Sequence, residues 1–132
     1  MNTIYTEIQK RILVLDGAMG TMIQQYKFTE EDYRGDKFKD FKVSVKGNND
    51  MLSITQPKAI REIHGKYLEA GADIIETNTF SSTTIAMADY DMQAYAYELN
   101  VAAATCARRA VEEFTAENKD KLYTPIILLT AK

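Results

Sequence analysis

Three short apolar runs, separated by stretches with helical periodicity, constrain the fold of this 132-residue chain more than any other feature. The runs cover residues 12–15, 73–76 and 125–129, and their apolar side chains are consecutive rather than alternating. Consecutive apolar residues are typical of strands that are buried on both faces, as in parallel sheets. We therefore predict an α/β fold in the order strand, helix, strand, helix, strand, with right-handed parallel crossovers.

Each of the first two runs ends in a carboxylate, Asp16 or Glu76, followed at once by small, hydroxylic or amide residues. The carboxyl ends of parallel strands carry the ligand sites of α/β proteins. We therefore expect both acids at the centre of one candidate site. A structural role stays open for Glu76, whose carboxylate could instead anchor the amide groups of the following loop.

The turn after Asp16 distinguishes between ligand classes. Neither glycine-rich phosphate-binding motif is present there, and an aspartate in the turn would repel phosphate. Gly17 and Gly20 permit a tight turn, and Thr21 is placed to cap a short helix that follows. Asp16 would accept hydrogen bonds from an ammonium group, while the backbone amides around Gly20 and Thr21 would hold a carboxylate. The turn therefore favours a zwitterion such as an α-amino acid.

The helical stretches have recognisable ends and faces. Thr55, with a capping hydroxyl, and Pro57 predict the start of a helix that Gly71 ends in a left-handed conformation. An isoleucine at every fourth position over residues 4–12 predicts a short amphipathic helix before the first strand. A long later helix is predicted to bury one face, made up of Tyr95, Leu99, Ala102, Ala103, Cys106, Ala110 and Phe114.

Residues 27–42 mix charges of both signs with aromatic side chains. We interpret them mainly as a solvated loop or short helix whose aromatic rings pack on the body. The alternative is an excursion that shelters the site, since long loops in compact domains are often functional. Residues 47–50, Gly-Asn-Asn-Asp, predict a tight turn.

Composition excludes several function classes. The net charge of −3, with 27% charged residues, provides no electrostatic footprint for nucleic acid. No apolar segment approaches the ~18 residues that cross a bilayer, and the first residues lack a signal-peptide pattern. A single cysteine fits a reducing compartment, so we expect a cytoplasmic protein. We interpret Cys106 as a core thiol and His64 as a helix residue at the margin of the core.

The third apolar run lies almost at the end of the chain, and only residues 130–132 follow it. A third strand in that position would be an uncovered apolar edge of the sheet. We therefore expect a fragment, or half of a fold that another polypeptide completes. Self-association through the exposed third strand is one expected consequence.

Four segments carry a resemblance to a known family: LDGAMGTMI at residues 15–23, KGNND at 46–50, GADIIETNTF at 71–80 and STTIAMADY at 82–90. Together they resemble the homocysteine-binding (homocysteine S-methyltransferase) domain of cobalamin-dependent methionine synthase. The resemblance implies that residues 1–132 form the first three strands of a parallel (β/α)8 TIM-type barrel. Such a barrel typically needs ~250 residues, so it would be incomplete here.

The resemblance also implies an activity, the transfer of a methyl group to the sulfur of homocysteine to make methionine. In the family, three cysteine thiolates hold a zinc ion that takes this sulfur as its fourth ligand and lowers the pKa of the thiol. The thiolate then attacks methylcobalamin. The implied partners are the rest of the barrel and the folate- and cobalamin-binding domains, with neither nucleic acid nor membrane.

The resemblance assigns roles to residues that lie within the matching motifs. Asp16 would bind the amino group of homocysteine, and the turn from Gly17 through Gly20 to Thr21 would line the amino-acid pocket. Glu76, Thr77 and Asn78 would shape the floor of the pocket or its hydrogen-bond network.

This chain departs from the family in two places. The zinc-binding cysteines lie in a stretch that this chain lacks, and Cys106 cannot replace them from a helix face. Residues 130–132 stand where the family usually carries a Gly-Pro-Thr-like turn, which suggests truncation, a frameshifted end or an artificial boundary. We therefore expect this chain alone to bind neither zinc nor cobalamin and to turn over no substrate. Three alternatives stay open: betaine or S-methylmethionine as methyl donor, an amino-acid-binding module without chemistry, and an inactive half-barrel that only folds or associates.

Overall fold

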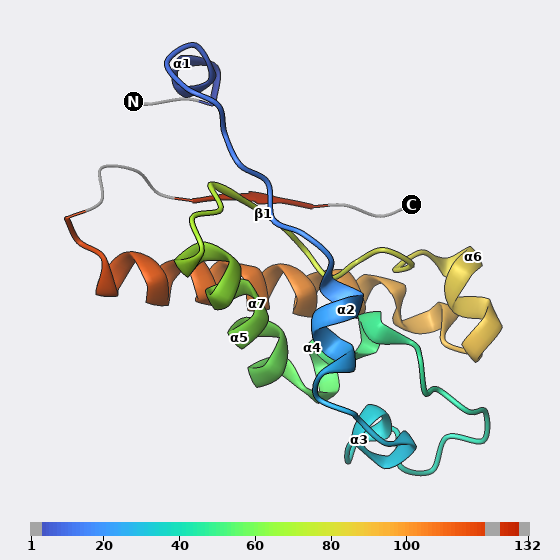
Figure 1. The fold of residues 1–132 in the computed structure, drawn as a ribbon. Helices are drawn as coiled ribbons and strands as arrows, with labels where there is room; N and C mark the ends of the chain where they lie inside the picture. The colour runs from blue at the N-terminus through green and yellow to red at the C-terminus, as the bar shows by residue number, and fades with distance from the viewer. Residues whose placement is uncertain (1–3, 121–124, 130–132) are drawn as a thin grey trace.

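The structure, a computed structural model, describes residues 4–120 and 125–129. The predicted departure at residues 130–132 lies outside the described residues. The helices are α1 (Ile4–Ile8), α2 (Met19–Gln24), α3 (Glu30–Arg34), α4 (Leu52–Thr55), α5 (Pro57–Glu69), α6 (Thr84–Met87) and α7 (Ala96–Glu117), shown in Figure 1. Short 3-10 helices are η1 (Asn49–Met51), η2 (Ala88–Tyr90) and η3 (Gln93–Tyr95). The strands are β1 (Ile74–Glu76) and β2 (Ile126–Leu128).

The sheet contains two parallel strands, β1 and β2. The paired residues are Ile74 with Ile126, Ile75 with Ile127, and Glu76 with Leu128. The prediction of strands at residues 73–76 and 125–129 is therefore confirmed, as is the α/β class. Parallel pairing of strands so far apart in sequence requires a long crossover, which α7 provides.

The strand predicted at residues 12–15 is not confirmed. Within the described part of the chain, this segment forms one isolated parallel bridge, between Leu15 and Ile74. The reason lies at Val14, whose carbonyl oxygen accepts the N–H groups of both Asp73 and Ile74 at 2.8 and 3.1 Å. The N–H of Val14 donates instead to the side chain of Asp73, at 2.9 Å from Oδ2. A side-chain acceptor thus interrupts the ladder, although the segment still runs beside β1.

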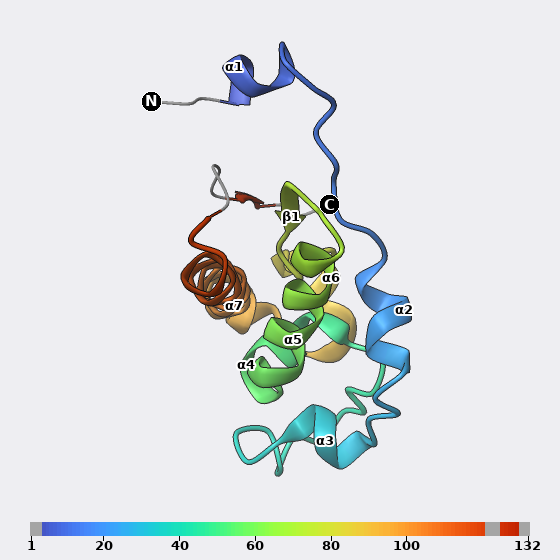
Figure 2. The same ribbon diagram turned by 60° about the vertical axis from the view of Figure 1, so that its left-hand side comes forward.

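Helices cover one face of the sheet (Figures 1 and 2). α5 and α7 lie side by side there and make the most extensive contact between two elements of the fold. The side chains that α7 buries confirm most of the predicted face: Ala96, Leu99, Ala103, Cys106, Ala107, Ala110, Val111 and Phe114. The predicted stop of α5 is also confirmed, because Gly71 has a φ of +106°. Its N–H donates to the Leu68 carbonyl oxygen and that of Ala72 to the Tyr67 carbonyl oxygen, both at 3.0 Å, which is a Schellman motif.

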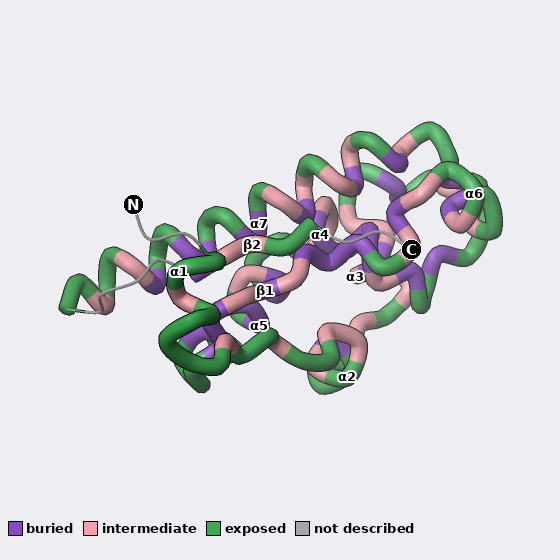
Figure 3. Tube along the Cα trace, turned by 90° about the horizontal axis from the view of Figure 1, so that it is seen from above, coloured by how far each residue is buried: buried purple, intermediate pink, exposed green. Residues whose placement is uncertain are grey.

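The other face of the sheet is open. α1, the predicted amino-terminal helix, stands off on that side and buries none of its residues (Figures 1 and 2). Val14 is 51% exposed and Leu129 is 61% exposed, and Figure 3 shows the same side of the molecule with little purple along β2. Apolar side chains on and beside the sheet are therefore exposed, in addition to others such as Ile85 and Tyr97 on the helices.

Two predicted helix caps are wrong. Thr21 does not cap a helix, because α2 already begins at Met19 and its N-cap residue is Ala18, which makes no side-chain cap bond. Thr55 belongs to α4, and the N-cap of α5 is Gln56. Pro57 does occupy the first turn of α5, as predicted.

Residues 27–42 pack their aromatic rings on the body, which confirms our main interpretation of this excursion. A capping box between Thr29 and Asp32 begins α3. Tyr33 and Phe38 are both buried, and the Phe38 ring packs edge-on against Tyr95, with 5.1 Å between ring centroids. Among the described residues, none of the helices has the length and apolar character needed to cross a membrane.

Candidate functional site

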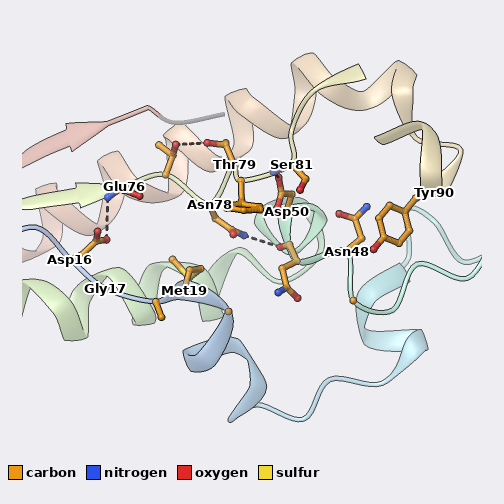
Figure 4. Close-up of a pocket in the computed structure, with 16 residues that line it drawn as sticks. Asp16, Gly17, Met19, Asn48, Asp50, Glu76, Asn78, Thr79, Ser81 and Tyr90 are labelled. Carbon is orange, nitrogen blue, oxygen red and sulfur yellow. Dashed lines mark hydrogen bonds between the residues drawn. The ribbon is translucent and has the colours of Figure 1, made fainter. Parts of the chain in front are cut away.

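A cavity of about 450 Å³ lies at the carboxyl end of β1 (Figure 4). Residues 16–20 and 76–81 form one side of it, which we call the strand-end wall. Residues 47–50 form the other side, which we call the loop wall, and Tyr90 lies beside them. All the predicted site residues except Thr21 line this cavity; Thr21 is exposed on α2.

Asp16 follows the extended segment beside β1, and its backbone N–H donates to the Ile74 carbonyl oxygen at 2.9 Å. Its Oδ2 accepts the backbone N–H of Glu76 at 3.1 Å (Figure 4). Burial raises the pKa of Asp16 from 3.8 to about 6; the hydrogen bond from Glu76 lowers it, and the negative charge of Glu76 raises it. At neutral pH the cavity therefore carries a carboxylate that a cationic partner would stabilise.

Glu76, Thr77 and Asn78 come directly from the end of β1. The N–H of Thr77 donates to the Leu128 carbonyl oxygen of β2 at 2.9 Å. Asn78 is 5% exposed, and its Nδ2 donates to the Asn49 carbonyl oxygen at 2.8 Å (Figure 4). Asn78 therefore joins the strand-end wall to the loop wall.

The turn after Asp16 lies against α5. A Cβ at Gly17 would lie 3.2 Å from Tyr67 Oη and 3.3 Å from Tyr67 Cε1. The same hydroxyl donates to the Ala18 carbonyl oxygen at 3.1 Å. The close approach of Tyr67 is thus the reason for a glycine at position 17, and its hydrogen bond holds the turn against the body.

The loop wall contains polar residues that we predicted only as a turn. Asp50 is 4% exposed, and its Oδ2 accepts the Ser81 N–H at 2.7 Å and the Ser82 hydroxyl at 2.6 Å. Burial raises the pKa of Asp50, while these two hydrogen bonds lower it. Asn48 is 3% exposed, and its Nδ2 lies 3.5 and 3.4 Å from the sulfur atoms of Met87 and Met92. The only sequence signal for this wall was the KGNND segment, because its contacts join residues far apart in the chain.

Two further candidate residues are core residues. Cys106 is a buried free thiol that lies 3.6 Å from the Ser53 carbonyl oxygen, and burial raises its pKa, which confirms the prediction of a core thiol. His64 lies deeper than predicted, at 0% exposure, and burial lowers its pKa to about 4. Histidine in that state is neutral at pH 7, and it lies away from the residues that line the cavity.

The residues present do not fit the zinc site that the resemblance implies. Within residues 4–120 and 125–129, no three His, Cys, Asp or Glu side chains are grouped so as to hold a metal ion. A tetrahedral thiolate site needs several cysteines, and the sequence has one, buried in α7. We therefore derive no chemical step from a metal held by this chain.

Comparison with known proteins identifies the family. Residues 13–129 match the family described as homocysteine S-methyltransferase. The oxidized form of the homocysteine methyltransferase MmuM from Escherichia coli superposes with a TM-score of 0.76 at 25% identity, over 99% of this chain and 41% of that one. Its metallated form superposes with a TM-score of 0.70 at 23% identity, over 98% of this chain and 40% of that one, and so shows the shared fold. This chain thus spans about two-fifths of the length of these enzymes, and it belongs to the homocysteine S-methyltransferase family.

Proposed function

We propose that this chain provides the amino-acid-binding part of a methyltransferase that transfers a methyl group to the sulfur of homocysteine. The observation that carries this proposal is the position of Asp16, half-buried in a cavity of about 450 Å³ with a pKa raised to about 6. A carboxylate in such a setting is a matched partner for the ammonium group of an amino acid.

Each wall of the cavity has a part in holding homocysteine. Asp16 binds the substrate ammonium through the carboxylate oxygens, while its hydrogen bond from Glu76 N–H keeps the side chain turned toward the cavity. Glu76 adds a second negative charge beside it. The small residues Gly17, Ala18 and Gly20 leave room for the substrate backbone beside α2.

More specifically, we propose the function of cobalamin-dependent methionine synthase in the cytoplasm, because the KGNND segment and the excursion before it resemble that enzyme. Zinc and cobalamin would then act in the full-length protein and not on this chain alone. The rest of the barrel and the folate- and cobalamin-binding domains would be its partners. A betaine- or S-methylmethionine-type methyltransferase would use the same homocysteine site with another methyl donor.

Calorimetric titration of the chain with reduced homocysteine tests the proposal, with and without zinc. Replacement of Asp16 by Asn removes a charge-assisted interaction of about 1.5–3 kcal/mol. The affinity should therefore fall about tenfold to a hundredfold. Asp40→Asn, an exposed carboxylate of the excursion, is the matched control and should change nothing. Absence of binding to the wild-type chain would overturn the proposed function, and equal binding by Asp16→Asn would overturn the role of Asp16.

The open sheet face favours a second candidate, a half-barrel that associates with itself. Leu15 is 47% exposed, Leu128 43% and Leu129 61%, all on or beside the sheet. Contiguous apolar exposure of this kind marks interaction surfaces. Light scattering after size exclusion should then give a mass above 15.0 kDa, whereas a monodisperse monomer would exclude self-association.

A further inference from the structure

We propose that Asn49 binds the carboxylate of the amino-acid substrate, and that Tyr33 positions the Asn49 side chain for this contact. This assignment rests on the proposed function and names the group that would recognise the second half of the zwitterion. Asn49 lies in the loop wall, on the cavity. Tyr33 comes from α3, in the excursion over residues 27–42.

The orientation of the Asn49 amide is determined by Tyr33. The Tyr33 hydroxyl donates to Asn49 Oδ1 at 2.7 Å. An amide oxygen can only accept a hydrogen bond, so the Tyr33 hydroxyl gives its single hydrogen to Asn49 Oδ1. The two amide hydrogens on Nδ2 therefore point away from Tyr33.

Tyr33 is well placed to hold that orientation. The side chain is 6% exposed, and its ring packs edge-on against Phe28 with 6.3 Å between centroids. The main chain of Asn49 is held as well, since its N–H donates to the Gly47 carbonyl oxygen at 3.0 Å and its carbonyl oxygen accepts from Asn78 at 2.8 Å. A side chain fixed at both ends binds a ligand with little loss of rotamer freedom.

The amide nitrogen faces the cavity beside Gly20. An ideal Cβ at Gly20 would lie 3.7 Å from Asn49 Nδ2, and its next neighbours are farther than 4 Å away. Among the hydrogen bonds of the described residues, none uses Asn49 Nδ2 as its donor. A donor that faces a cavity without a protein partner is available to a ligand acceptor.

The cavity thus has two chemically different ends. The acidic end contains Asp16 and Glu76, which attract the ammonium group. The Asn49 amide provides a donor on the opposite wall, where the Asp50 carboxylate already accepts hydrogen bonds from Ser81 and Ser82. A primary amide and a carboxylate form hydrogen bonds of the charge-assisted kind. The zwitterion would therefore bind in one direction, with its ammonium on the strand-end wall and its carboxylate on the loop wall.

The test compares homocysteine with 3-aminopropane-1-thiol, which keeps the thiol and the amine but lacks the carboxylate. Calorimetry with the full chain should show about a tenfold loss of homocysteine affinity in Asn49→Ala, and no change for the amine. Tyr33→Phe should lower homocysteine affinity by about threefold and leave the affinity for the amine unchanged. Tyr26→Phe is the matched control, because its hydroxyl contacts Glu62 outside the cavity and should affect neither ligand.

The ratio of the two affinities separates recognition of the carboxylate from damage to the fold. Equal losses for both ligands in Asn49→Ala, or no loss for either, would overturn the assignment of Asn49. If Tyr33→Phe lowers the affinity for both ligands equally, Tyr33 is not a positioning residue for this contact. If Asp16→Asn weakens both ligands while Asn49→Ala weakens neither, the proposed function stands and this inference fails. If the wild-type chain binds no homocysteine, both fail together.

Discussion

The two walls of the cavity use their carboxylates in opposite ways. In the strand-end wall, Asp16 accepts one backbone hydrogen bond, and its pKa is raised to about 6. In the loop wall, Asp50 is 4% exposed and accepts two short hydrogen bonds, from Ser81 and Ser82. The first carboxylate has capacity left for a ligand, whereas the second holds the walls together. Proximity to a cavity therefore does not by itself identify a ligand-binding acid.

The walls also differ in what supports them. The strand-end wall continues from β1 and from the segment beside it, and main-chain hydrogen bonds hold both. Within the described ranges, no strand lies behind the loop wall, which depends instead on the excursion over residues 27–42. There the Glu30 carboxylate accepts the N–H groups of Val45 and Lys46, each at 2.8 Å, and the Ser44 hydroxyl at 3.0 Å. One side chain of α3 thus anchors the loop that leads to residues 47–50.

The largest effect expected from this difference is on stability, at Asp50. Asp50→Ala leaves the partly buried Ser81 N–H and the buried Ser82 hydroxyl without an acceptor, and each such loss costs about 1–3 kcal/mol. We expect a loss of about 3 kcal/mol in the free energy of unfolding, measured by urea denaturation. Asp16→Ala should cost less than about 1 kcal/mol, because water in the cavity can replace the carboxylate. Similar costs for the two variants would remove the distinction between the walls.

A smaller loss of stability is expected at Glu30, which anchors the loop wall. Glu30→Ala should lower the free energy of unfolding by about 1–2 kcal/mol, because its side chain is 26% exposed and water can take over part of its hydrogen bonding. Homocysteine affinity should fall with it, as the loop wall loses its anchor. Glu31→Ala, the exposed neighbour on α3, is the control and should lie within about 0.5 kcal/mol of wild type. Wild-type affinity in Glu30→Ala would show that the loop wall holds its position without α3.

The strand-end wall should respond to pH. If Asp16 binds the substrate ammonium as proposed, only its ionised form holds homocysteine, and the affinity should fall about tenfold between pH 7 and pH 5, through the pKa of about 6. The free energy of unfolding should depend on pH in the opposite direction. Because folding raises this pKa from 3.8 to about 6, the contribution of Asp16 is fully present below pH 3.8 and is lost as the pH rises through 6. Asp16→Asn should abolish both dependences, in calorimetry and in urea titrations at a series of pH values; their persistence would assign them to another group.

The smallest effect is expected where the two walls meet. Gly20→Ala adds a methyl group at ordinary contact distance, 3.7 Å from Asn49 Nδ2, within α2. Alanine in a helix should raise stability by roughly 0.5 kcal/mol, while the methyl group covers the donor and lowers homocysteine affinity a few-fold. Gly65→Ala in α5, where a Cβ meets no atom within 4 Å, should give a similar gain in stability with unchanged affinity. Equal affinities in the two variants would count against a ligand contact beside Gly20.

Much of the fold could be predicted because its signals are local. The strands β1 and β2 follow from consecutive apolar residues, and the end of α5 follows from a glycine with a positive φ. The strand at residues 12–15 was predicted in the same way, yet its ladder is interrupted by the Asp73 side chain, 59 residues from Val14. The prediction of a cap at Thr21 was wrong because α2 starts at Met19, three residues after Asp16 and earlier than the apolar pattern indicated.

The candidate site was likewise predictable only in part. By itself, the sequence determined that Asp16 and Glu76 end neighbouring strand segments and therefore face one cavity, because a parallel sheet brings the carboxyl ends of its strands to one edge. Only the tertiary structure decided what lies opposite. Asn49 meets Tyr33 across 16 residues and Asn78 across 29, and Asp50 meets Ser82 across 32. Contacts of that range leave no periodicity in a sequence, since they depend on how α3 and the loop pack on the body rather than on backbone geometry within one element.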